Sequence, residues 1–153
     1  MIQKNIAFGK KTFHSGQRES QMRKFQCVII SVDYFLIMSE KNCIFCKIIA
    51  GQTPSEMVYE DDVCVAFSDL NPQSPKHILI VPREHIESLD KARNKHQETL
   101  GYLLLVAAEI ARDEGIAESG YRTVINTNGD GGQTVFHLHV HLLGGRPFVF
   151  PPG

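Results

Sequence analysis

The sequence predicts an α+β domain with five strands and two helices. Three observations predict this fold class: apolar and polar residues alternate through 136–142, short stretches rich in β-branched and aromatic residues recur between turn formers, and one long stretch repeats apolar residues at helical spacing. With 153 residues, 42% of them hydrophobic, the chain fits one compact domain with a sizeable core.

The first predicted element is a short helix in CIFCKIIAG, residues 43–51. Ser39 and Asn42 are candidate N-terminal caps, and Gly51 is expected to end the helix. Three strands are expected next, in EMVYE (56–60), VCVAFSD (63–69) and HILIVP (77–82), with turn formers between them.

The main helix is predicted within 94–115, where apolar residues recur at helical spacing and Gly115 is the expected stop. The residues expected to face the sheet are Leu100, Leu103, Leu104, Ala107, Ala108 and Ala111. YRTVINTN (121–128) and the stretch around 136–142 complete the five strands.

Three of the seven histidines, His137, His139 and His141, alternate with apolar residues in the last strand. On a strand, one face would carry Phe136, Leu138, Val140 and Leu142, and the other face would carry the three imidazoles. A helix would place His139 away from the other two histidines. Such a row can bind a metal, shuttle protons near neutral pH or attack phosphorus, and a solvated strand face is the plainer alternative.

Charge divides the chain into two parts, an N-terminal extension at 1–37, which we expect to be disordered or a targeting segment, and a domain at 38–153. The extension carries six Lys or Arg against Glu19 and Asp33, and the remainder is acidic, with 10 basic against 15 acidic residues. The acidic domain predicts no binding to nucleic acid, and the apolar run after Lys24 is too short to cross a membrane. We expect a cytoplasmic or nuclear protein; mitochondrial import through the basic extension is the alternative, and Met38 is a candidate start.

Cys43 and Cys46 form a C-x-x-C motif. In a chain without a convincing secretory signal, this spacing indicates metal or redox use in a reducing compartment. Two ordinary reduced cysteines are the plainer alternative.

The chain resembles the histidine triad (HIT) family, and within it the Hint branch. HLHVH is followed by two leucines, NTNGDGGQTVF precedes it, and GGRPFVFPPG follows; CIFCKII and YEDDVCVAFSDLNPQSPKHILIVPREHI occur in the family's order. The resemblance covers about residues 42–153. It implies a five-stranded antiparallel sheet with two helices, and a homodimer whose sheets join into one continuous sheet.

The resemblance also implies hydrolysis of the bond between a purine nucleoside monophosphate, AMP or GMP, and an amine. His139 would attack phosphorus and form a nucleotidyl-histidine intermediate, with its other nitrogen bonded to the carbonyl of His137. His141 would donate a proton or hydrogen bond near the leaving group, and His77 matches a fourth histidine near the phosphate.

Nucleotide-binding residues are implied in the same way. Asn126, Gln133 and Thr134 match residues that contact phosphate, although Asn126 could simply form a turn, and Asp69 matches the carboxylate that accepts both ribose hydroxyls. The base pocket would be formed by Ile44, Phe45, Ile48, Phe67 and Leu70. Ser68 stands where some relatives carry histidine, so the base preference stays open.

Some bacterial relatives hold a structural zinc ion with residues that match Cys43, Cys46, His85 and His137. The resemblance therefore implies a closed Cys₂His₂ zinc site. A nucleic-acid-binding zinc module is disfavoured because His85 lies thirty-nine positions after Cys46, and His137 fifty-two beyond that. Two further alternatives stay open: hydrolysis of dinucleoside polyphosphates, and nucleotide binding with little catalysis.

Overall fold

The computed structural model describes residues 42–150. The extension at 1–37 and the final Pro-Pro-Gly lie outside these residues, so the domain boundary stays a prediction. The described elements are α2 (Ile44–Ile49), β1 (Met57–Glu60), β2 (Cys64–Ser68), β3 (Lys76–Pro82), the 3₁₀ turns η1 (Leu89–Lys91) and η2 (Asn94–His96), α3 (Gln97–Asp113), β4 (Arg122–Val124) and β5 (Val140–Gly144).

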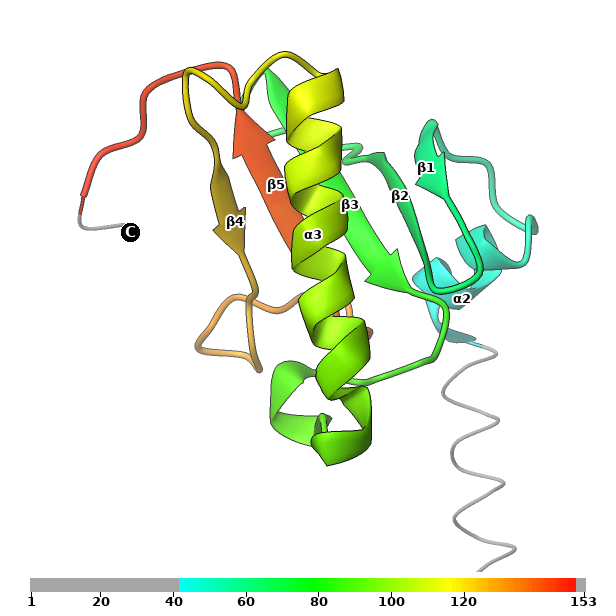
Figure 1. Ribbon diagram of the computed structural model, residues 1–153. Coiled ribbons are helices and arrows are strands. Elements are labelled where there is room, and N and C mark those ends of the chain that lie inside the picture. Colours follow the sequence, from blue (N-terminus) through cyan, green and yellow to red (C-terminus); the bar gives the residue numbers. More distant parts are fainter. Residues whose placement is uncertain (1–41, 151–153) are drawn as a thin grey trace, which may run out of the picture. The chain divides into compact units, whose positions relative to one another are not determined.

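The strands form one sheet in the order β1-β2-β3-β5-β4, and every neighbouring pair is antiparallel (Figure 1). Within residues 42–150, this confirms the α+β fold with five antiparallel strands and two α-helices. No helix within 42–150 is both long and apolar enough to cross a membrane.

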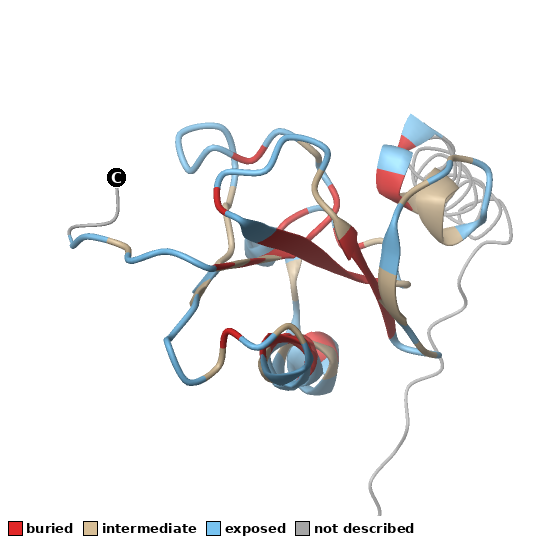
Figure 2. Cartoon of the chain, turned by 90° about the horizontal axis from the view of Figure 1, so that it is seen from above, coloured by how far each residue is buried: buried red, intermediate tan, exposed pale blue. Residues whose placement is uncertain are grey.

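The long helix α3 covers one face of the sheet, and β2 and β3 are buried along most of their length (Figure 2). Its buried face is formed by Leu103, Val106, Ala107, Ile110 and Ala111, which pack on Ile78, Ile80, Val140 and Leu142 of the central strands. Leu104 was expected in this core and is 46% exposed, because the buried stripe runs through 103, 106, 107, 110 and 111 instead.

The short helix α2 packs on the other face. Phe45 of α2 joins Phe67, Leu79 and Val81 in a second apolar cluster. Because side chains alternate along a strand, Ile78 and Ile80 face α3 while Leu79 and Val81 face α2. The same alternation in β5 turns Val140 toward α3 and His141 to the α2 side.

Three local predictions are wrong. The last strand begins at Val140, not at 136, because the chain bends through 135–137, where the His137 N–H donates to the Val135 carbonyl at 2.9 Å. Phe136 therefore leaves the apolar row and is 49% exposed. The residue before α2 is Cys43, without a side-chain cap, so Asn42 is not its cap; Ser39 lies outside the described residues.

Both predicted helix stops are confirmed. Gly51 follows α2 with φ +69°, and Gly115 follows α3 with φ +68°. Glycine adopts this left-handed conformation without the steric cost that other residues meet.

Candidate active site and metal centre

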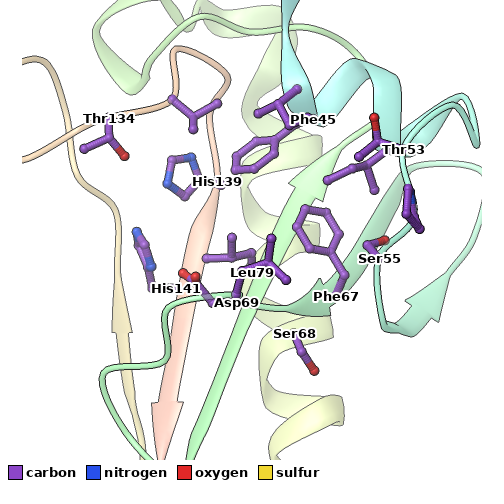
Figure 3. Close-up of a pocket in the computed structure, with 15 residues that line it drawn as sticks. Phe45, Thr53, Ser55, Phe67, Ser68, Asp69, Leu79, Thr134, His139 and His141 are labelled. Carbon is purple, nitrogen blue, oxygen red and sulfur yellow. The ribbon is translucent and has the colours of Figure 1, made fainter.

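A cavity of about 250 Å³ opens on the α2 side of the sheet (Figure 3). Its polar end carries Asp69, Thr134, His139 and His141. All five residues expected in a base pocket line it: Ile44, Phe45, Ile48, Phe67 and Leu70. A mostly apolar cavity with a few convergent polar groups is typical of a small-ligand site.

Sequence reasoning missed several residues that line the cavity, namely Thr53, Pro54, Ser55, Leu79 and Val135. Only Leu79 had a detectable signal, since strand alternation places it on the same face as His77. The loop residues 53–55 carry no periodic pattern that could have shown where they face.

His139 is buried against the ring of Phe45, with the two ring centroids 5.2 Å apart. Its Nδ1–H donates to the carbonyl of His137 at 2.7 Å. Burial lowers the pKa of His139, and the hydrogen bond to the carbonyl opposes that shift only in part. A neutral ring with a proton on Nδ1 has its lone pair on Nε2, which is the form a nucleophile needs.

Beside His139 lies a chain of polar groups. His77 Nε2 is 2.9 Å from His141 Nδ1, and Asp69 Oδ2 is 3.4 Å from the same nitrogen of His77. Asn126 Nδ2 is 3.5 Å from His141 Nε2. Burial, followed by repulsion from His139 and His77, lowers the pKa of His141 to about 4.

The Gln133 side chain lies outside the lining of the cavity and braces the loop. Its Oε1 accepts from the Asn128 N–H at 2.9 Å, and its Nε2 donates to the carbonyls of Glu87 at 2.8 Å and Val135 at 3.1 Å. With the amide occupied in this way, the expected contact between this side chain and phosphate has no support in the geometry. Thr134, next to it, does line the cavity.

The four expected metal ligands lie together. The Sγ atoms of Cys43 and Cys46 are 3.4 Å and 3.5 Å from His137 Nδ1, and Cys46 Sγ is 3.2 Å from His85 Nδ1. Metal–sulfur and metal–nitrogen bonds of usual length in a tetrahedral site place sulfur and nitrogen about 3.6 Å apart. The cluster therefore fits a tetrahedral divalent ion.

The protonation of the cluster fits a metal as well. His137 Nε2–H donates to the Pro82 carbonyl at 2.9 Å, so Nδ1 directs its lone pair at the thiols. Burial would raise the pKa of Cys43, but hydrogen bonds with His137 and His85 outweigh it and lower the pKa to about 5. Thiolate and neutral imidazole are the forms that bind metal.

Asp69, His77 and His141 form a second group, whose ligand atoms lie within 4.8 Å of one another. Two histidines and a carboxylate can hold a transition metal. Here, however, His77 Nδ1 accepts the Gln73 N–H at 3.2 Å, so in the neutral ring Nε2 carries the proton and offers no lone pair. This second group does not fit a metal.

Comparison with known proteins agrees with this architecture. A family model described as "HIT domain" matches residues 50–148. The chain is 53% identical over 104 residues to the purine nucleoside phosphoramidase of Escherichia coli K12, covering 68% of this chain and 87% of the relative.

A plant relative and a solved structure extend the comparison. The chain is 51% identical over 118 residues to the 14 kDa zinc-binding protein of Zea mays, covering 76% of this chain and 91% of the relative. A crystal structure of a HIT family hydrolase from Legionella pneumophila Philadelphia 1 superposes with a TM-score of 0.72 at 46% identity, covering 73% of this chain and all of the other.

The buried imidazoles predict that stability falls in mild acid. The unfolded chain takes up a proton on His141 near pH 6.5 and the folded chain only near pH 4, so the free energy of unfolding decreases as the pH falls through this window. Urea midpoints measured from pH 7 to pH 4 should show this decline, and His141→Gln should make it shallower. An unchanged slope in the variant would show that His141 does not resist protonation.

Proposed function

The chain belongs to the HIT domain family, and from that membership we propose that it is a purine nucleoside phosphoramidase acting through a nucleotidyl-histidine intermediate. The hydrogen bond from His139 Nδ1 to the His137 carbonyl carries this proposal, because it leaves Nε2 unprotonated beside the cavity. The E. coli relative named purine nucleoside phosphoramidase supports the choice of substrate.

The reaction takes two steps at phosphorus. In the first, His139 Nε2 forms a bond to phosphorus while the P–N bond breaks and its electron pair leaves with the amine. In the second, water attacks phosphorus, the P–N bond to His139 breaks, and the nucleoside monophosphate is released. Over both steps water supplies the hydroxyl that phosphorus gains and the proton that the amine gains.

Other side chains position the nucleotide. The apolar wall that includes Phe45 and Phe67 would hold the purine, and the Thr134 hydroxyl at its polar end would meet the phosphate. The Asn126 amide, which is outside the lining but beside His141, would also contact the phosphate. Asp69 Oδ1 accepts the Asn71 N–H at 2.8 Å, which fixes the carboxylate and leaves lone pairs for the ribose hydroxyls. His141 would donate a hydrogen bond to the phosphate or the departing amine.

We propose that zinc occupies the cluster of Cys43, Cys46, His85 and His137, a view that the zinc-binding plant relative supports. Four protein ligands would leave no position for a reacting water, so the ion is structural. It would tie α2 to the residues that precede β5. Through His137 it would also steady the carbonyl that orients His139.

We also propose a homodimer whose sheets join. β4 is at one end of the strand order, and Leu104 and Leu105 are exposed on α3. Light scattering of the full chain should give twice the chain mass of 17.2 kDa. A mass of one chain at micromolar concentration would contradict the dimer.

Replacing the nucleophile tests the activity directly. His139→Asn should lower the turnover of adenosine phosphoramidate at least about 10³-fold, because the covalent route is lost. AMP binding, measured by calorimetry, should survive, whereas Asp69→Ala should weaken AMP binding. Turnover that persists in His139→Asn would remove His139 as nucleophile.

Elemental analysis of protein purified without chelator, under reducing conditions, tests the metal. We expect about one zinc per chain, because in the second group His77 carries its proton on Nε2, the nitrogen that would have to bind the ion. Cys43→Ser should lose the ion, and the control Cys64→Ala, a buried cysteine outside the cluster, should keep it. Zinc-free protein, or zinc lost on Asp69→Asn, would contradict this assignment.

A further inference from the structure

We propose that the backbone N–H of Gln73 is a positioning group that sets the tautomers of His77 and His141, so that His141 presents Nε2–H at the phosphate end of the cavity. The consequence for nucleotide binding rests on the proposed function. The assignment of the two tautomers does not rest on the proposed function.

The series of hydrogen bonds begins at the Gln73 N–H, which can donate but cannot accept. A backbone amide only donates, so His77 Nδ1, 3.2 Å from the Gln73 nitrogen, must accept, and the proton of the neutral ring lies on Nε2. His77 Nε2 is 2.9 Å from His141 Nδ1, which must therefore accept in turn. The proton of His141 is then on Nε2.

The groups around the two rings are compatible with a proton on Nε2 of both His77 and His141. Burial lowers the pKa of both His77 and His141, which favours neutral rings near pH 7, while Asp69 opposes the shift in both. The Asn71 carbonyl also raises the pKa of His77, and the side-chain amide of Gln73 donates to the same carbonyl at 2.9 Å. Asp69 Oδ2, 3.4 Å from His77 Nε2, faces the nitrogen that carries the proton.

The turn that supplies the amide is held on several sides. The Asp69 N–H donates to the His77 carbonyl at 2.9 Å, and Ser74 Oγ donates to the Lys76 carbonyl at 2.6 Å. Arg146 Nη2 donates to the Gln73 carbonyl at 3.2 Å. These contacts hold the turn on which the Gln73 N–H lies.

Two neighbouring histidines thus receive opposite tautomers. The centroids of His139 and His141 are 4.8 Å apart, yet His139 keeps its proton on Nδ1 and His141 on Nε2. One ring offers a lone pair to phosphorus and the other offers a donor to the phosphate oxygens. The structure places Asn126 Nδ2 at 3.5 Å from His141 Nε2. A proton on Nε2 requires the flipped assignment of this amide, with Oδ1 toward the ring and the NH₂ away from it.

Nitrogen-15 NMR of the imidazole rings in the full-length, metal-loaded protein at pH 7 tests the assignment. Two-bond ¹H–¹⁵N correlations distinguish protonated from unprotonated ring nitrogens. We expect Nε2–H on His77 and His141, and Nδ1–H on His139. A proton on Nδ1 of either His77 or His141 would overturn the proposal, whether or not the protein hydrolyses phosphoramidates.

A matched pair of variants tests the cause. Gln73→Pro removes the N–H, and Gln73→Ala keeps it. In Gln73→Pro we expect mixed tautomers at His77 and His141, and about tenfold weaker binding of AMP with adenosine binding unchanged, the size expected for one hydrogen bond to a charged group. Gln73→Ala should keep the original tautomers.

Unchanged tautomers and unchanged AMP binding in Gln73→Pro would overturn the role of the amide. If this variant does not fold, the spectrum of the original protein decides alone. Correct tautomers without turnover of phosphoramidates would defeat the proposed function and leave this inference standing.

Discussion

The hydrogen bond from His139 to the His137 carbonyl is the interaction on which the rest of the site depends. The side chain of His137 directs Nδ1 at Cys43 and Cys46, and its Nε2–H donates to the Pro82 carbonyl. His137 therefore links the Cys43/Cys46/His85 cluster to His139. If the proposed zinc and the proposed reaction both hold, this shared residue would let a structural ion and a nucleophile occupy one row of histidines.

The sheet supplies the frame that makes this arrangement possible. Val140 and Leu142 anchor β5 in the core under α3, so His141 is held on the opposite face without a loop of its own. A rigid strand holds a functional side chain more accurately than a mobile loop does. His141 and its neighbours consequently take their positions from the same apolar packing that stabilises the fold.

Sequence reasoning reached the fold because the fold rests on short-range patterns, whereas most of the candidate site residues came from the resemblance. Alternation, helical spacing and glycine stops indicated the elements, and the resemblance supplied candidate roles. Sequence reasoning failed at the start of the last strand, where the chain bends through 135–137 instead of extending the strand, and the His137 N–H donates to the Val135 carbonyl. The bracing role of Gln133 and the direction of the Gln73 N–H depend on partners that no local pattern shows.

The central claim is that His139 Nε2, freed by the His137 carbonyl, bonds covalently to phosphorus. Rapid quenching of the protein with adenosine phosphoramidate, followed by intact-mass and peptide analysis, tests it most directly. The account predicts a transient adduct with the added mass of an adenylyl group, located on His139. Turnover without any adduct at the earliest times, or an adduct on another residue, would contradict it.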